Sequence, residues 1–272
     1  MEMMSTTLYQ ILPGVSGMGN NRVCVSIGTS DLNALKKMVN ESFSSNADFI
    51  EVRFDFFEKS VMNDALGIVL DRKEQAVFTC RSPREGGRYA GAEPDRVTAL
   101  RRLAAFRPML LDVEYSTMKE NEDLLDQFTA LNCDTLVSWH NFDLTPGRDE
   151  LVNLMNKMKE YSSNIKIVCM AKSIDDSISI LKLYEDAKSV GINLIAFCMG
   201  EHGILSRVLC TYAGARFTYA SLGDALAPGQ LTVKQMGAIY ERLEKSGFND
   251  YSAWKDRQDF ADILRMINEA KW

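Results

Sequence analysis

The chain has 272 residues, of which 46% are hydrophobic and 25% charged, and its formal net charge is -6. This composition is that of a soluble globular protein, and an acidic excess without a run rich in Lys and Arg argues against a nucleic-acid partner. No apolar run approaches the roughly 18 residues of a membrane span, and residues 1–21 lack the charge pattern of a secretory signal, so we expect a cytoplasmic protein.

Two kinds of segment alternate along the chain. Short β-favouring runs lie at Val23–Ile27, Phe49–Phe54, Gln75–Cys80, Met109–Glu114, Thr135–His140, Ile165–Met170, Asn193–Met199 and Arg216–Ala220. Amphipathic stretches long enough for helices lie between them, at Asp31–Ser45, Pro94–Arg107, Glu122–Asn132, Asp149–Tyr161, Asp175–Ser189 and Ile204–Gly214. Strand starts recur roughly every 23 to 34 residues, the span of one βα unit. Eight such units predict an α/β fold, a single-domain (β/α)8 TIM barrel with its core at about residues 23–245.

An open doubly wound sheet is the alternative to a barrel. Such a sheet normally carries G-x-G-x-x-G after its first strand, whereas Gly14, Gly17 and Gly19 precede the first predicted strand. We interpret these glycines as the turn of an N-terminal hairpin that covers the bottom of the barrel. The C-terminal extension after Lys245 is expected to contain a final helix at Asp256–Lys271.

The six cysteines form no C-x-x-C pair, and most of them lie inside apolar runs. Small buried thiols are expected there, so the cysteines predict reduced core residues rather than disulfides. No Cys/His cluster accompanies His140, which argues against a metal site there. The cysteines are Cys24, Cys80, Cys133, Cys169, Cys198 and Cys210.

A barrel places its chemistry at the carboxyl ends of its strands. Glu51, Arg53 and Asp55 alternate with apolar residues in the second strand region, so their side chains are expected to project inward. The third strand leads into Arg81 and the segment Glu85-Gly86-Gly87, a loop that could approach a ligand or move. Alternatively, the inward charges only pair with one another, and the loop is only solvated.

A lysine and a histidine follow two neighbouring predicted strands. Lys172 comes after the apolar run that begins at Asn164, and we place it at the carboxyl end of that strand. An apolar pocket there would disfavour the charged form of the amine and make it a nucleophile. His140 ends the preceding strand, whereas His202 lies in a polar turn and is expected at the surface. Both Lys172 and His140 could instead be structural, a solvated lysine and a hydrogen-bonded histidine.

Two further groups lie near the predicted barrel mouth. Arg207 follows the seventh strand and Gln230 follows the eighth. An arginine and a side-chain amide can hold a carboxylate through several hydrogen bonds. Together with the lysine, the histidine and the carboxylates, they favour imine chemistry on a keto acid.

These motifs resemble those of the type I 3-dehydroquinate dehydratases, the Schiff-base-forming enzymes of the shikimate pathway, from Val23 to about Lys245. The matching segments are Glu51-Val-Arg53-Phe-Asp55, Thr79-Cys-Arg81-Ser-Pro-Arg-Glu85-Gly86-Gly87, Ser138-Trp-His140-Asn-Phe-Asp143, Met170-Ala-Lys172-Ser173, Ser206-Arg207 and Ala227-Pro228-Gly229-Gln230. The resemblance implies dehydration of 3-dehydroquinate to 3-dehydroshikimate, a small-molecule substrate, without metal or organic cofactor. It also implies a homodimer.

The resemblance further implies a role for each matched residue. Lys172 would form the imine with the C3 ketone, His140 would act as general acid and base, and Glu85 would orient His140. The remaining matched residues would bind substrate, with Arg207 and Gln230 on its carboxylate and Glu51, Arg53 and Arg81 on its hydroxyl-bearing ring.

One position departs from the family pattern. The family often has serine before Ala-Pro-Gly-Gln, with its hydroxyl among the ligand contacts, and this chain has Leu226. We therefore expect a modified closing-loop contact and weaker substrate binding.

Two other functions stay open on the sequence alone. One is a lysine-imine aldolase acting on a sugar phosphate, although no glycine-rich phosphate cradle follows the seventh and eighth strands. The other is a barrel that has kept its fold but serves only as a binding or scaffold protein.

Overall fold

The computed structural model describes residues 22–246, 263–265, 267 and 269, and eight parallel strands form its sheet. The neighbours in the sheet follow the order β7-β6-β5-β4-β3-β2-β1-β8, so strands adjacent in sequence pair and β8 returns to β1. The strands are β1 (Val23–Ile27), β2 (Phe49–Arg53), β3 (Ala76–Thr79), β4 (Leu110–Glu114), β5 (Thr135–Asn141), β6 (Asn164–Met170), β7 (Asn193–Met199) and β8 (Thr218–Ala220).

The two ends of this sheet come together through side chains. The rings of Phe197 on β7 and Tyr219 on β8 lie 6.0 Å apart, centre to centre. Helix α8 (Ile204–Ala213) packs here, and each of its residues from Ile204 to Thr211 is buried. The sheet is therefore a nearly closed barrel, which confirms the (β/α)8 prediction, and the doubly wound alternative is wrong.

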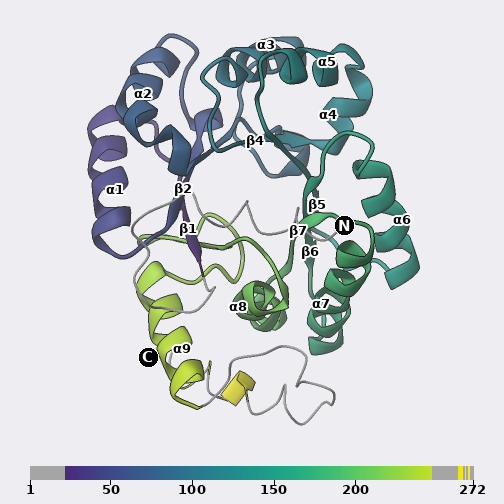
Figure 1. Cartoon of the computed structure of the whole chain (residues 1–272). Coiled ribbons are helices and arrows are strands. Elements are labelled where there is room, and N and C mark those ends of the chain that lie inside the picture. The colour runs from purple at the N-terminus through teal and green to yellow at the C-terminus, as the bar shows by residue number, and fades with distance from the viewer. Residues whose placement is uncertain (1–21, 247–262, 266, 268, 270–272) are drawn as a thin grey trace, which may run out of the picture.

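Helices surround the strands as a ring (Figure 1). The remaining ones are α1 (Leu32–Ser44), α2 (Met62–Val69), α3 (Glu93–Ala104), α4 (Tyr115–Glu120), α5 (Asp123–Ala130), α6 (Arg148–Met158), α7 (Ile174–Ser189) and α9 (Val233–Lys245). The six helices predicted from sequence are confirmed to within one turn at each end. Short single-turn 3-10 helices also occur, including η1 (Phe54–Phe56) and η3 (Pro83–Glu85).

Three helices, α2, α4 and α9, were not predicted. Helix α4 has six residues and no side-chain cap, so its local pattern is weak. Helix α9, by contrast, has a clear pattern, because Thr232 and Gln235 form a capping box and Val233, Met236 and Leu243 are buried along one face.

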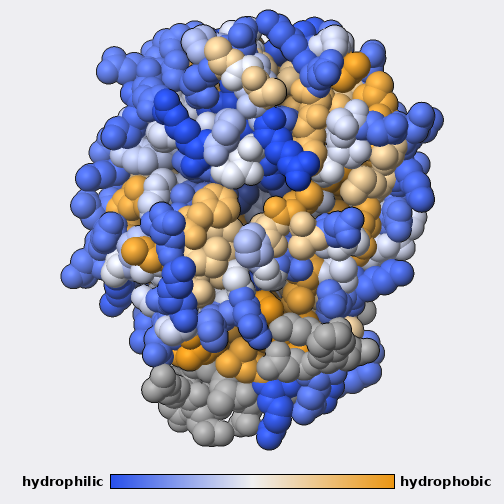
Figure 2. All heavy atoms as spheres, turned by 180° about the vertical axis from the view of Figure 1, so that it is seen from behind, coloured by the Kyte–Doolittle hydropathy of each residue, from blue (hydrophilic) through white to orange (hydrophobic). Residues whose placement is uncertain are grey.

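The core lies on both faces of the sheet. Every residue of β1 and β4 is buried, as expected for parallel strands covered by helices outside and filled by side chains inside. Figure 2 shows the face opposite to that of Figure 1, with hydrophilic side chains over most of its periphery and hydrophobic ones nearer its centre. All six cysteines are free and buried, as predicted.

Some predictions concern residues beyond the described range. The N-terminal hairpin predicted in residues 1–21 and most of the helix predicted at Asp256–Lys271 lie outside the described residues. Within the latter stretch, Ile263–Arg265, Ile267 and Glu269 are helical, and Ile263 and Ile267 are buried. In the part of the chain that the structure describes, no helix is both long and apolar enough to cross a membrane.

The cap of α9 gives a stability prediction. In the Thr232→Ala variant, the backbone N–H of Gln235 loses its acceptor, the Thr232 hydroxyl at 3.2 Å. The free energy of unfolding should therefore fall by about 1 kcal/mol. Urea denaturation measures this change. Thr98→Ala, at an exposed threonine of α3, is the control and should stay within about 0.5 kcal/mol of the wild type.

Candidate active site

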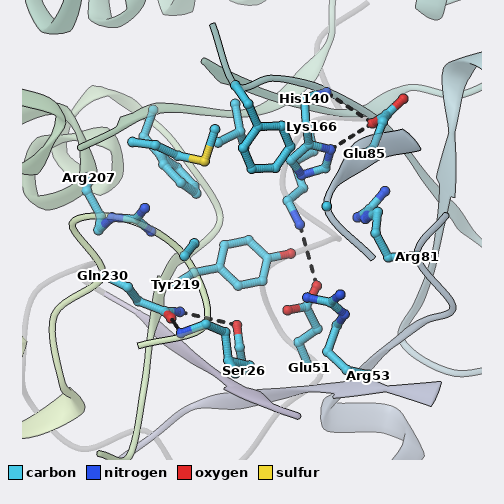
Figure 3. Close-up of a pocket in the computed structure, with 17 residues that line it drawn as sticks. Ser26, Glu51, Arg53, Arg81, Glu85, His140, Lys166, Arg207, Tyr219 and Gln230 are labelled. Atoms are coloured by element: carbon cyan, nitrogen blue, oxygen red, sulfur yellow. Dashed lines mark hydrogen bonds and ion pairs between the residues drawn. The ribbon is translucent and has the colours of Figure 1, made fainter. Parts of the chain in front are cut away.

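A pocket lies at the carboxyl ends of the strands (Figure 3), where a TIM barrel carries its chemistry. Seven of the eight predicted site residues line it together: Glu51, Arg53, Arg81, Glu85, His140, Arg207 and Gln230. The other lining residues are Ser26, Gly86, Phe142, Lys166, Val168, Phe197, Met199, Tyr219, Leu226 and Ala227.

The eighth predicted residue, Lys172, lies outside the pocket. Strand β6 ends at Met170, and Lys172 is exposed in the turn that starts α7. The backbone N–H groups of Lys172 and Ser173 donate to Asp176 Oδ2 at 2.7 and 2.9 Å, which fixes this turn as a helix cap. The structure therefore does not place Lys172 in the pocket, because the cap of α7 holds its backbone in an exposed turn beyond the end of β6.

Lys166 supplies the pocket with an amine. It lies in the middle of β6, and strand alternation points Lys166 and Val168 into the pocket. Its Nζ lies 3.4 Å from Glu51 Oε1 and 3.1 Å from Asp112 Oδ2, and the residue is only 5% exposed. The sequence analysis missed it, although a single charged residue inside an otherwise buried strand is itself unusual.

The buried carboxylate of Asp112 joins Lys166 to Arg81. Arg81 Nη2 lies 2.7 Å from Asp112 Oδ2, and Ser138 Oγ donates to Asp112 Oδ1 at 2.6 Å. Burial raises the pKa of Asp112, but the charges of Arg81 and Lys166 more than offset this and hold the pKa below its usual range. Asp112 therefore stays ionised and fixes both cations.

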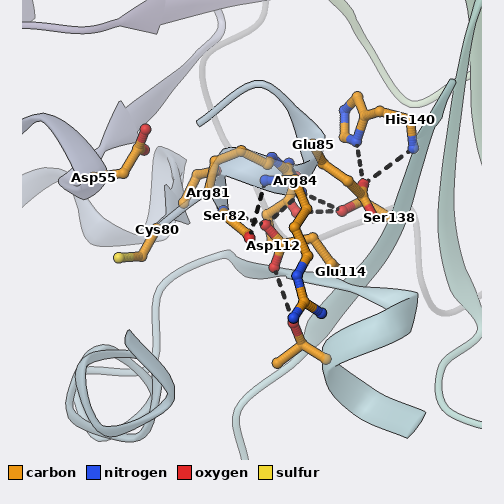
Figure 4. A network of polar contacts seen from close by, with 12 residues as sticks. Asp55, Cys80, Arg81, Ser82, Arg84, Glu85, Asp112, Glu114, Ser138 and His140 are labelled. Carbon is orange, nitrogen blue, oxygen red and sulfur yellow. Dashed lines mark hydrogen bonds and ion pairs between the residues drawn. The ribbon is translucent and has the colours of Figure 1, made fainter. Parts of the chain in front are cut away.

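Behind the pocket, a second buried pair holds the backbone on either side of Arg81. Glu114 Oε1 accepts from the Ser82 backbone N–H at 2.8 Å (Figure 4). Its Oε2 accepts from Arg96 Nη1 at 2.7 Å, and the same nitrogen donates to the Cys80 carbonyl at 2.7 Å. Arg96 is fully buried. The pair thus positions the segment that carries Arg81 and, three residues beyond Ser82, Glu85.

Glu85 and His140 form a hydrogen-bonded pair. Glu85 Oε2 accepts from the His140 backbone N–H at 3.1 Å and lies 2.8 Å from Nδ1 of its ring. Burial raises the pKa of Glu85 to about 8, and burial together with Arg81 and Lys166 lowers the pKa of His140 well below its usual value. Both shifts favour the uncharged forms, and an uncharged imidazole can accept a proton.

A phenylalanine closes the pocket beside this pair. The ring of Phe142 stacks on that of His140, with centres 6.4 Å apart and planes 21° apart. Gly86 has φ of 76°, and a Cβ there would lie 2.5 Å from Phe142 Cζ. Glycine is therefore needed at this position for both the backbone conformation and the approach of the ring.

The opposite wall of the pocket carries a guanidinium with unused donors. Arg207 is 1% exposed, and its Nε and Nη2 have no hydrogen-bond partner among the described residues. The guanidinium carbon lies 4.4 Å from the centre of the Phe197 ring. Burial lowers the pKa of Arg207 to about 10, so it is still charged at neutral pH. Buried unpaired donors of this kind are suited to bind an anionic acceptor.

Gln230 and Leu226 belong to the loop after β8. Gln230 Oε1 accepts from the Leu226 backbone N–H at 2.8 Å, and its Nε2 lies 3.4 Å from Ser26 Oγ. Leu226 lines the pocket with an apolar side chain. The leucine at the position where serine is expected is thus part of the pocket wall.

The inward charges predicted on β2 divide into two groups. Glu51 and Arg53 line the pocket, whereas Asp55 lies buried in η1 outside it. Asp55 binds the Arg53 guanidinium through two contacts of 2.8 and 2.7 Å. Asp55 therefore orients Arg53. His202 is exposed, as predicted.

Comparison with known proteins assigns the family. Residues 23–246 match the model of the family described as type I 3-dehydroquinase. The chain belongs to this family. It is 40% identical over 223 residues to a 3-dehydroquinate dehydratase of Dehalococcoides mccartyi, a match that covers 81% of this chain and 94% of the relative.

Two more distant relatives agree. A 3-dehydroquinate dehydratase of Methanopyrus kandleri is 34% identical over 205 residues, which cover 75% of this chain and 91% of that protein. The crystal structure of the type I enzyme of Clostridium difficile, with covalently modified comenic acid, superposes with a TM-score of 0.73 at 25% identity. That match covers 85% of this chain and 94% of the other.

The residues that the structure describes contain no group of three or more His, Cys, Asp and Glu side chains that could hold a metal ion. The pocket instead offers an amine, an imidazole and guanidinium groups. These groups suit covalent and acid–base catalysis on an anionic carbonyl compound.

The raised pKa of Glu85 gives a prediction about pH and stability. Between its ordinary value near 4.5 and about 8, the folded protein keeps a proton on Glu85 that the unfolded chain releases. The stability contribution of this proton is complete below about pH 4.5 and is lost as pH rises toward about 8. The free energy of unfolding of the wild type, measured relative to Glu85→Gln, should therefore fall across this window.

Urea denaturation of both proteins at several pH values tests this. Glu120→Gln, at an exposed carboxylate of α4 that pairs with the exposed Arg84, serves as control and should show no such trend. A difference between wild type and Glu85→Gln that is constant from pH 5 to 8 would contradict the prediction.

Proposed function

We propose that this chain dehydrates 3-dehydroquinate to 3-dehydroshikimate through an imine on Lys166. The observation that carries the proposal is a buried amine that shares one pocket with an imidazole–carboxyl pair and with unpartnered guanidinium donors. Membership of the type I 3-dehydroquinase family supports the substrate. In this proposal Lys166 takes the role that the motif resemblance implies for Lys172.

Lys166 would start the reaction. Its Nζ attacks the C3 ketone, a carbinolamine forms, and loss of water gives the imine. The two carboxylates beside Nζ, Glu51 and Asp112, hold the amine in place and stabilise the protonated imine that forms there. A protonated imine withdraws electrons more strongly than a ketone, so the neighbouring C2 proton becomes more acidic.

His140 would move the protons. Its uncharged imidazole accepts the C2 proton, the electron pair forms the C1–C2 double bond, and the C1 hydroxyl leaves as water with a proton from the imidazolium. Glu85 lies 2.8 Å from Nδ1, and this hydrogen bond holds the ring in place while it gains and loses the proton. Water then hydrolyses the imine, with His140 again as acid and base, and releases 3-dehydroshikimate from Lys166.

The walls of the pocket would hold the substrate at two ends. The free Nε and Nη2 of Arg207 suit the substrate carboxylate, with Gln230 beside it (Figure 3). Glu51, Arg53 and Arg81 lie on the other side, where they suit the ring hydroxyls. Arg53 and Arg81 are themselves held by Asp55 and Asp112, so they bind with little loss of side-chain entropy.

Several broader expectations accompany this function. The reaction would serve the shikimate pathway of aromatic amino-acid biosynthesis in the cytoplasm. It would need no metal or organic cofactor, because the protein's own amine supplies the electron sink. The homodimer also stays a prediction, as does the single domain.

Replacement of each of the two lysines by alanine gives the sharpest test. Lys166→Ala should lower kcat/KM for 3-dehydroquinate by at least about a thousandfold, because the covalent step is lost. Lys172→Ala, only six residues away on an exposed turn, should keep wild-type activity. Steady-state kinetics, followed by the absorbance of the conjugated product, measures both.

Mass spectrometry shows the covalent step directly. Borohydride reduces an imine to a stable amine, so wild type and Lys172→Ala treated with 3-dehydroquinate and borohydride should carry the adduct on the peptide that contains Lys166. Lys166→Ala should carry none. An adduct on Lys172, or an active Lys166→Ala variant, would refute the assignment, and an adduct formed only with sugar phosphates would favour an aldolase.

Leu226 gives a prediction about binding. In Leu226→Ser, a hydroxyl replaces an apolar group of the pocket wall, and we expect KM for 3-dehydroquinate to fall several-fold as one hydrogen bond is gained. The matched control is Ala225→Ser, which adds the hydroxyl at the neighbouring exposed residue and should leave KM unchanged. An unchanged KM and kcat in Leu226→Ser would rule out a contact at this position.

A further inference from the structure

The pocket contains a phenol group whose hydroxyl is unused. Tyr219, on β8, is 3% exposed and lines the pocket. Its Oη has no hydrogen-bond partner among the described residues. Because a buried hydroxyl without a partner costs free energy, one that persists at the centre of a binding pocket calls for an explanation.

Neighbouring aromatic side chains fix the ring of Tyr219. It packs edge-to-face on Phe217 with ring centres 5.4 Å apart, and the ring of Phe197 lies 6.0 Å away. Lys166 Nζ lies 4.2 Å from the centre of the ring. The phenol ring is therefore held between the rings of Phe197 and Phe217 on one side and the Lys166 amine on the other. This packing fixes the position of the hydroxyl.

In Figure 3 the hydroxyl of Tyr219 points across the pocket, away from Arg207 and toward the side that carries Glu51, Arg53 and Arg81. Burial, and next the charge of Glu51, raise the pKa of Tyr219 well above its ordinary value. The group therefore keeps its proton at neutral pH. It is available as a hydrogen-bond donor.

From this geometry we infer that Tyr219 is a further catalytic residue, whose hydroxyl donates a hydrogen bond to a substrate oxygen at or beside the carbon that joins Lys166. The inference rests on the proposed function, since it takes that carbon to be the ketone carbon of the substrate.

The position of Lys166 limits which substrate oxygens the Tyr219 hydroxyl can reach. Nζ lies over the Tyr219 ring, 4.2 Å from its centre. An oxygen on the carbon bonded to Nζ, or on the next carbon, would therefore lie within reach of the hydroxyl at the ring edge. Two oxygens meet this condition: the carbinolamine oxygen, which must leave for the imine to form, and the ring hydroxyl next to the ketone. A donor to either one stabilises the covalent intermediate more than the free substrate.

Tyr219→Phe tests this inference with the removal of one oxygen atom. The variant should lower kcat/KM for 3-dehydroquinate about five- to tenfold, the effect of one neutral hydrogen bond. The rise in Tm that 3-dehydroquinate produces in borohydride-free solution should be smaller than in the wild type. The Tm without substrate should stay the same or rise, because the hydroxyl that is removed has no partner in the free protein.

Tyr240→Phe is the matched control. Tyr240 is also buried, on α9, but its hydroxyl lies 3.2 Å from the Val208 carbonyl, to which it donates. Loss of this bond should lower Tm by about 2–4 °C and leave kcat/KM unchanged. The two variants should therefore show opposite patterns. Tyr219→Phe should lose activity and keep stability, whereas Tyr240→Phe should lose stability and keep activity.

The outcomes separate the two proposals. If the wild type forms the Lys166 adduct and the product, but Tyr219→Phe has kcat/KM within twofold of it and the same substrate-induced rise in Tm, the Tyr219 inference is overturned and the dehydratase function stands. If Tyr219→Phe lowers Tm without substrate and leaves kcat/KM unchanged, its role is structural and the inference also fails. A folded wild type without adduct or product overturns the proposed function itself.

Discussion

One buried carboxylate determines how the pocket can be built. Asp112 lies between Arg81 and Lys166, and all three side chains are almost completely removed from water. Two buried cations so close together would repel each other, and the carboxylate allows both to stay in the low-dielectric interior. The amine of Lys166 is thus accommodated inside the barrel because β4 supplies Asp112 next to it, with Glu51 of β2 as its other contact. Ser138, from β5, completes the hydrogen bonding of Asp112.

Two kinds of polar group in and behind the pocket have opposite effects on the free protein. The carboxylates behind the pocket, Asp112 and Glu114, are satisfied by ion pairs and hydrogen bonds and hold their elements together. The donors that face into the pocket, on Arg207 and Tyr219, have no partner among the described residues and lower the stability of the free protein until a ligand accepts from them. Such a site is preorganised for an anionic, oxygen-rich molecule, and the cost is tolerated because the barrel around it is large.

The sequence predicted the barrel and most of the pocket, because each rests on a local pattern. Eight apolar runs at regular spacing determine the strands, and polar residues at their ends determine the mouth. Lys172 was misplaced because its motif lies at an apparent strand end, whereas strand alternation, applied to Lys166, would have pointed that residue inward. Tyr219 could not be found in this way. A tyrosine in a short strand reads as ordinary core, and only three-dimensional packing shows that its hydroxyl lacks a partner.

The pairing of β1 with β8 has a consequence for how the molecule is made. Val23 lies opposite Thr218, so the barrel closes only when nearly the whole described chain is available. Until then one edge of β1 has no strand beside it, and its five residues, all buried in the finished fold, are exposed to other chains. Contacts between residues so distant in sequence form late and slowly. During synthesis on the ribosome, this edge of β1 therefore stays unpaired until β8 has been made, and an unpaired strand edge is prone to aggregation.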